Sequence, residues 1–489
     1  MIVEVANVIA IQIGGMAVAL AAGEHRLRYL IPAGFISGLC VHLLIGASQA
    51  LLLMQTWPVI TIIGTASLPV GWLLFQRRGA NIEHPGWMQL GLVVAGAGMA
   101  AALFASLDRI NFHVDSHEYM AIGALLNAGT FAEGVSLFQI EKRLLVVPLM
   151  HAPGNLTGSY YLASVTPLLA IATLLLLAWL CEASLRDRLP QTVTVSVAAG
   201  AALLLLTTNR FVQNAFYING HLLFGALFLL LAGTAWLTVV RRTHEFVALQ
   251  LLAIPVMVLT RAEAPLVVAL LIAPIVLDRH RSRAHRIALV ITLGGSVAVW
   301  QLFLLLLHER REATISLSIL GMLTLGVAFL LLSPAVRMRF LEQHQIPLLI
   351  LVEAGLWATL ALAAVRDSQP LRDSLRATYE NLLQGVGGWG YSLVFVAAAA
   401  ALALVATRPE GRLFLRFPLT AFIPLVLLLA YFRDGAYRVG AADSLNRMLI
   451  HILPTAILFI ATAALTRPGS PRDSEEATES IPAQARSGT

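Results

Sequence analysis

Long apolar runs alternate with short polar segments along almost the whole chain. A membrane-spanning helix needs about 20 predominantly apolar residues, and the pattern predicts an all-α polytopic membrane protein with about 13–15 transmembrane helices. Two half-length runs share residues 244–278 and are predicted to form a hairpin. The longer runs lie near 3–22, 29–54, 58–76, 87–107, 160–182, 191–208, 218–240, 287–307, 314–332, 346–365, 391–407, 416–432 and 447–466.

Composition supports a bilayer environment. Only 12% of the 489 residues are charged, about half of the roughly 25% found in soluble proteins, and mean hydropathy is +0.79. The net charge of +6 does not indicate nucleic acid as a partner, because the basic residues are spread over short loops and form no continuous patch. Cys40 and Cys181 lie in or beside apolar runs without metal-ligand or CxxC spacing, so neither a disulfide framework nor a thiol site is expected.

Charge in the loops predicts the orientation. Cytoplasmic loops of membrane proteins carry an excess of Lys and Arg, and alternate loops here are short and basic. We therefore expect a multi-pass protein of the cell membrane (the plasma or bacterial inner membrane) whose 108–158 segment lies on the non-cytoplasmic side. The basic loops are Glu24–Arg28, Arg77–Arg78, Arg186–Arg188, Arg241–Arg242 and Arg279–Arg286.

The chain is predicted to divide into three membrane parts and a tail. In the outer loop, Tyr119–Leu126 and Leu144–Met150 are amphipathic and are expected to lie in the outer interface. No repeat relates the two halves, which argues against a transporter built on repeats. The parts are N-terminal helices (1–86), a membrane core (87–280) with the outer loop 108–158, C-terminal helices (281–466), and a disordered cytoplasmic tail (467–489).

The densest polar run, Asp108–Tyr119, follows some twenty almost uncharged residues. Ionisable groups at the end of a membrane helix indicate a functional site, although Asp115 could equally be a solvated helix end or cap. His113, His117 and His151 could bind a divalent cation together with Asp115 or Glu118, since carboxylate and imidazole are common ligands. Isolated interfacial histidines are the simpler explanation.

Asp115-x-x-Glu118-Tyr119, at the exit of a predicted membrane helix and before an amphipathic one, resembles the first outer loop of the GT-C glycosyltransferases. These membrane enzymes use sugars carried on polyprenyl phosphate or pyrophosphate. Residues 256–271, centred on Thr260–Pro265, are similar to the family's hairpin with a Thr-Arg-Pro-Glu type tip, with Ala262 where proline is usual. Residues 214–230 are similar to the family's outer segment before a central span, with His221 where an acid is frequent.

The resemblance implies transfer of a sugar from a polyprenyl-phosphate donor to a lipid-linked glycan, polysaccharide or protein acceptor at the outer interface. Asp115 would be the base of an inverting displacement and Glu118 its helper. Arg261 is the first candidate for the donor phosphate, because guanidinium binds phosphate in a bidentate way, although Arg261 and Glu263 could simply form an ion pair that caps the hairpin. No cofactor beyond the optional cation is implied. Further candidates are Tyr119, His117, Tyr217 and His221 for substrate, and Arg372 and Arg376, then Arg433, Arg438 and Arg447, for phosphate or lipid headgroups.

Two other classes of protein remain open. A lipid-linked oligosaccharide polymerase or ligase would rely on outer arginines such as those in 366–388 and 433–446. A lipid or solute transporter would need a polar path through the bilayer, and charge inside the apolar runs is almost limited to Glu353. Glu353 and His451 are expected to make polar contacts within the bundle. Replacing Asp115 separates these alternatives from the glycosyltransferase.

Overall fold

Every predicted apolar run that the structure describes forms a helix. The structure is a computed structural model, and it describes residues 2–24, 26–75, 114–134, 144–241, 246–278, 280–307, 343–406, 413–432, 438–440 and 444–463. These residues are about 84% helical and contain no strand. Within these ranges eight helices are long and apolar enough to cross a membrane, or nine if one bent pair counts as a single span. The fold is therefore that of an all-α polytopic membrane protein.

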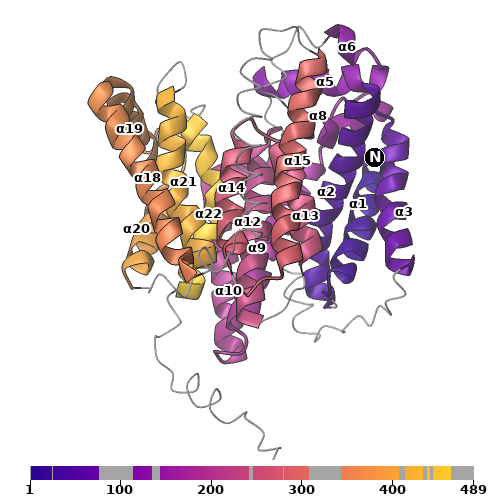
Figure 1. The fold of residues 1–489 in the computed structure, drawn as a ribbon. Helices are drawn as coiled ribbons and strands as arrows, with labels where there is room; N and C mark the ends of the chain where they lie inside the picture. The colour runs from indigo at the N-terminus through magenta and orange to yellow at the C-terminus, as the bar shows by residue number, and fades with distance from the viewer. Residues whose placement is uncertain are drawn as a thin grey trace, which may run out of the picture.

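Helices α1 (Ile2–Ala21), α2 (Leu27–Leu53) and α3 (Pro58–Phe75) form a tightly packed group at one edge of the bundle (Figure 1). Glycines permit the close approach of α1 and α2. A Cβ atom on Gly15 would lie 1.7 Å from the carbonyl oxygen of Gly34, and one on Gly38 would lie 1.8 Å from that of Ile11. Small residues commonly serve this purpose where membrane helices pack.

The core lies around α12 (His221–Arg241), which is 89% buried over its most apolar window. In Figure 1 the helices α9 and α12 lie between the α1–α3 group and the C-terminal helices. By contrast, α3 and α18 are only 17% buried and expose large apolar side chains, as expected for lipid-facing helices. The other apolar helices are α9 (Val165–Leu185), α13 (Val247–Val258), α14 (Ala264–Val276), α15 (Arg283–Leu307), α18 (Gln345–Arg366), α20 (Tyr391–Ala406), α21 (Leu413–Phe432) and α22 (Ser444–Ala463).

The span predicted at 191–208 is part of a broken element. Helix α10 (Gln191–Leu206) is followed by α11 (Asn209–Ala215) after a 74° bend. The polar residues of α11 account for the break, because a straight continuation would carry them along the membrane helix. The bend brings α11 against α9, α12 and α22.

One end of the bundle, called here the α5 end, collects the interfacial elements (Figure 1). Two backbone bonds join them to the bundle: the amide of Thr56 donates to Leu126 O at 3.0 Å, and that of Val146 donates to Leu259 O at 3.3 Å. The helices α5 and α8 overlap the two segments predicted to be amphipathic, but every residue of α8 is buried, so α8 has no exposed polar face. The elements are α5 (Val114–Ala128), α6 (Phe131–Gly134), α8 (Val146–His151), the 3₁₀ helix η2 (Ala152–Thr157) and the tip of the α13–α14 hairpin.

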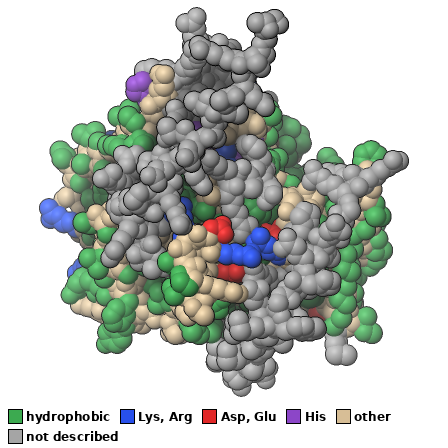
Figure 2. All heavy atoms as spheres, turned by 90° about the horizontal axis from the view of Figure 1, so that it is seen from below, with side chains coloured by type: hydrophobic (Ala, Val, Ile, Leu, Met, Phe, Trp, Pro, Cys, Tyr) green, Lys and Arg blue, Asp and Glu red, His purple; other side chains and the backbone are tan. Residues whose placement is uncertain are grey.

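The opposite end carries the loops predicted to be cytoplasmic. There the amide of Phe246 donates to Ala22 O at 3.2 Å, and the buried Arg281 donates to Asp278 Oδ2 at 3.1 Å and Ala235 O at 2.7 Å. Figure 2 views this end and shows charged side chains near the centre with apolar side chains around the rim. The side of the membrane on which each end lies stays a prediction.

Four predicted elements lie outside the described residues: the spans at 87–107 and 314–332, the segment Asp108–His113, and the tail 467–489. One further helix was not expected. Helix α19 (Gln369–Leu382) buries Ser374, Ala377 and Asn381. Most of its residues are polar, so it does not appear among the long apolar runs of the sequence.

Candidate active site at the α5 end

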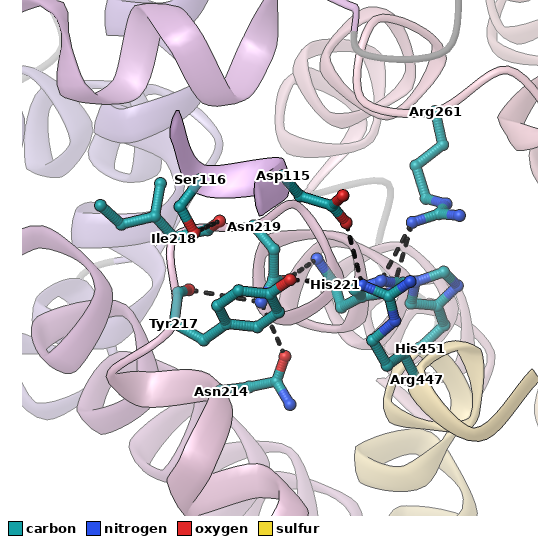
Figure 3. Close-up of polar contacts among 10 residues, drawn as sticks. All are labelled: Asp115, Ser116, Asn214, Tyr217, Ile218, Asn219, His221, Arg261, Arg447 and His451. Carbon is teal, nitrogen blue, oxygen red and sulfur yellow. Dashed lines mark hydrogen bonds and ion pairs between the residues drawn. The ribbon is translucent and has the colours of Figure 1, made fainter. Parts of the chain in front are cut away.

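Asp115 lies in the first turn of α5 and forms an ion pair with Arg447 of α22 (Figure 3). The Arg447 Nη1 atom is 3.1 Å from Asp115 Oδ2, and the two side chains are 17% and 15% exposed. One face of α5 packs against the bundle. On this face Ser116 is buried, and its hydroxyl donates a hydrogen bond to Ile218 O at 3.2 Å. The amphipathic period of α5 thus fixes Asp115 over the start of α22.

Tyr217 joins the ion pair from the connection between α11 and α12. Arg447 Nη1 donates to the Tyr217 hydroxyl oxygen at 3.3 Å, so one nitrogen contacts both the phenol and Asp115. Burial raises the pKa of Tyr217, and the cation of Arg447 only partly opposes this effect. The phenol is therefore neutral at physiological pH and can donate a hydrogen bond to a substrate oxygen.

A second polar group centres on Arg261 at the tip of the α13–α14 hairpin. Its Nε atom lies 2.5 Å from Glu263 Oε1, so the ion pair expected as one alternative is present. Its Nη1 atom lies 3.1 Å from His221 Nε2 and 3.4 Å from His221 Nδ1. Near-equal distances to both ring nitrogens place the guanidinium over the face of the imidazole and outside its plane, as in a cation–π contact.

His221 pairs with His451 in the interior. Their Nδ1 and Nε2 atoms are 3.0 Å apart, and the rings are stacked with centroids 5.2 Å apart. The backbone amide of His221 donates to Asn219 Oδ1 at 2.7 Å, and Asn219 Nδ2 donates to Asn214 Oδ1 at 3.0 Å. These contacts fix the start of α12, and with it the imidazole on which Arg261 lies (Figure 3).

Arg210 of α11 adds a third guanidinium close enough to Arg447 for the two like charges to interact. Its Nε atom donates to Gly387 O at 2.5 Å, and Asn446 Nδ2 donates to the same carbonyl at 3.0 Å. Gly387 belongs to the glycine-rich segment 385–390, whose Trp389 is completely buried and bonded to Asn446. This segment therefore joins α11 to the start of α22 beside the ion pair.

The other candidates on α5 lie away from the ion pair. Tyr119 is 8% exposed and packs against Val147 and Ile218, which suits a structural role. Glu118 is half-buried. His117 lies two residues after Asp115, about 200° around the helix, and is exposed. It lines a separate cavity of about 370 Å³ with Met120, Ala121, Ala124, Ser159, Tyr160 and Tyr161.

Of the C-terminal arginine candidates, Arg447 contacts Asp115, whereas Arg372 and Arg376 lie elsewhere. Arg376 lies on α19, is 79% exposed, and pairs with Glu380 at 2.8 Å. Arg372 lies on the same helix and is exposed. Neither makes an ion pair or side-chain hydrogen bond with the cluster of Asp115, Arg447 and Arg261, as far as the described residues show. Arg433 lies outside the described residues.

The described residues contain no group of three His, Cys, Asp or Glu side chains that could hold a metal ion. His151 is buried, and its Nδ1 accepts a hydrogen bond from the Leu162 amide at 3.2 Å. His113 is not among the described residues.

Two members of the cluster were ranked low from the sequence. Arg447 was a secondary phosphate candidate, and His451 was expected only to make a polar contact within the bundle. Their spacing was a usable signal, because residues four apart on an apolar helix lie on one face. Polar side chains at such positions have to meet polar partners inside the bundle.

Comparisons with models of protein families, with curated proteins and with solved structures find no match to this chain.

Proposed function

We propose that this protein is a membrane glycosyltransferase of the GT-C type. It would transfer a sugar from a polyprenyl-phosphate donor to a lipid-linked glycan, polysaccharide or protein acceptor. The observation that carries the proposal is the half-buried carboxylate of Asp115, paired with the guanidinium of Arg447 at one end of an apolar helix bundle. A base and a phosphate-binding cation are the two groups that this reaction needs.

The proposed step uses each side chain once. Asp115 takes the proton of the acceptor hydroxyl, and the acceptor oxygen forms a bond to the anomeric carbon of the sugar. The bond from that carbon to the phosphate oxygen breaks, and its electron pair leaves with the phosphate. The negative charge that develops there is stabilised by Arg447 and Arg261. One displacement on one face inverts the configuration at the anomeric carbon.

The three stretches that resemble the GT-C family supply residues of the same cluster, which supports the proposal. The first outer loop supplies Asp115, the segment before the central helix supplies Tyr217 and His221, and the hairpin tip supplies Arg261. Unrelated resemblances would have no reason to meet in space. Lipid-facing helices next to such a site would suit the polyprenyl chain of the donor.

The test compares membranes that contain wild type, Asp115→Asn or Asp373→Asn at matched expression. Asp115→Asn removes the base with little change in shape, whereas Asp373 is an exposed carboxylate on α19 and serves as the control. Lipid-linked and surface glycans are measured by mass spectrometry. We expect wild type and the control to add a sugar that Asp115→Asn does not add. Equal glycans in all three membranes would exclude this function and favour the polymerase or transporter alternatives.

A further inference from the structure

The base in the proposed reaction is already engaged by a cation. Asp115 Oδ2 lies 3.1 Å from Arg447 Nη1. An adjacent cation stabilises the charged form of a carboxylate and makes it a weaker base. A carboxylate with this partner would take a proton poorly until the partner moves.

Arg447 has hydrogen-bonding capacity that the protein does not use. Arginine carries five N–H donors, and the Arg447 Nε is buried with no hydrogen-bond partner in the described part of the chain. Its Nη1 is shared between Asp115 and Tyr217. An unpaired buried donor has a free-energy cost, which an additional acceptor such as a phosphate oxygen would remove.

The charges around the pair also favour an anion. Tyr217 from the α11–α12 connection, Arg210 from α11 and His221 at the start of α12 are each close enough to Arg447 to interact with its charge. Among the described residues Asp115 is the carboxylate in contact with Arg447, while Arg210 adds a like charge. A second anion beside Arg447 would relieve the repulsion between the two guanidinium groups and would compete with Asp115 for Arg447.

We propose that Arg447 is shared between Asp115 and the donor phosphate, so that a bound phosphodiester draws Arg447 away and frees Asp115 to act as the base. This inference rests on the proposed function. Arg447 is then a positioning residue for Asp115 as well as a phosphate ligand. The base would become available only when the donor is present, which would limit transfer of the sugar to water before binding is complete.

The test is a double-mutant cycle on binding, in which no turnover occurs. The full chain in nanodiscs is titrated with farnesyl methyl phosphate, a phosphodiester that keeps one negative charge over the whole working pH range. Dissociation constants are measured for wild type, Asp115→Asn, Arg447→Gln and the double variant. Arg186→Gln, at an exposed arginine directly after α9, is the control. Circular dichroism and thermal unfolding verify that each variant is folded.

Competition for Arg447 gives a defined result. Asp115→Asn should bind the phosphodiester at least about fivefold more tightly than wild type, because the competing carboxylate is gone. In the Arg447→Gln background the same replacement should change affinity by less than about twofold. Arg447→Lys, which keeps the charge, should restore part of the coupling.

Three results would overturn the proposal: no tightening by Asp115→Asn, the same tightening with and without Arg447, or no binding by any variant. The second result would show only a general charge effect. The transfer experiment decides the function separately. If Asp115→Asn abolishes transfer but the two replacements affect binding independently, the protein is a glycosyltransferase whose Arg447 is not shared. If the effects of the two replacements on binding are coupled but wild type transfers no sugar, the phosphodiester site stands and the glycosyltransferase function is excluded.

Discussion

Asp115 and Arg447 are separated by 332 residues in the sequence, and their side chains form an ion pair of 3.1 Å. The pair joins the interfacial helix α5 to the start of α22. Asp115 belongs to one of the stretches that resemble the GT-C family, whereas α22 lies outside all of them. This single contact therefore connects the predicted catalytic loop to the C-terminal part of the bundle.

The ion pair gives a prediction for stability. Arg447→Gln removes the cation that contacts the half-buried carboxylate of Asp115 and should lower the free energy of unfolding by about 1–3 kcal/mol. Adding Asp115→Asn should recover most of this loss, because the half-buried negative charge is then removed as well. Thermal unfolding in detergent at matched conditions measures both effects. A double variant no more stable than Arg447→Gln would show that the pair does not contribute in this way.

The histidine pair gives a prediction for activity. His451→Phe keeps the aromatic packing against Phe224, whose ring centroid lies 4.4 Å away, but removes the contact with His221. Stability should change by less than about 1.5 kcal/mol for a swap of similar volume, whereas transfer should fall at least about tenfold as Arg261 loses its fixed platform. His42→Phe alters a buried histidine of α2 that contacts Thr65 and serves as the control in the transfer assay. Equal activity of the two variants would exclude a positioning role for His451.

The α1–α2 contact gives a prediction from geometry alone. A Cβ atom on Gly38 would lie 1.8 Å from the backbone oxygen of Ile11, so Gly38→Ala must push the two helices apart. We expect a loss of about 1–3 kcal/mol, typical of overpacking. Gly71→Ala on α3 meets nothing within 4 Å and should be neutral or slightly stabilising. Unfolding midpoints of the two variants in the same detergent measure the contrast, and similar midpoints would contradict the close approach of the helices.

His151 gives a prediction for pH dependence. Burial lowers the pKa of this interfacial histidine from 6.5 to about 4. Above pH 6.5 neither the folded nor the unfolded form is protonated at this residue, and its full contribution to stability is present. As the pH falls from 6.5 to 4 the unfolded form binds a proton that the folded form does not, so stability falls by up to about 3 kcal/mol.

The matched variant for this pH test is His151→Asn, whose Oδ1 can still accept the bond from the Leu162 amide. Unfolding midpoints of wild type and variant are followed from pH 7 to pH 4. The wild type should lose more stability than His151→Asn over that interval. Parallel curves would show that His151 does not titrate differently in the folded and unfolded forms.

Much of the fold could be predicted from hydrophobicity. Each described apolar run is helical because a bilayer admits only segments that satisfy their own backbone hydrogen bonds, and the amphipathic period of 119–126 indicated the helix at the α5 end. The pattern did not reveal the 74° break after α10 or helix α19. The break depends on where polar residues can find partners, and α19 is polar on average, so a search for long apolar runs finds neither.

The candidate site divides in the same way. The pattern of polar and apolar residues along the chain indicated Asp115, Tyr217, His221 and Arg261 as candidates, because each lies in a short polar stretch beside an apolar run. It could not show that His117 lies on the far face of α5, or that α19 keeps Arg376 exposed. Those outcomes depend on which face of each helix is buried.

The sequence by itself determined an all-helical membrane chain and the residue types that form its polar stretches, since both follow from local composition and period. Only the tertiary structure decided which of these stretches meet. The placement of Arg447 against Asp115, and of His451 against His221, depends on α22 packing beside α12. That packing is a contact between distant segments, for which hydropathy along the chain carries no information.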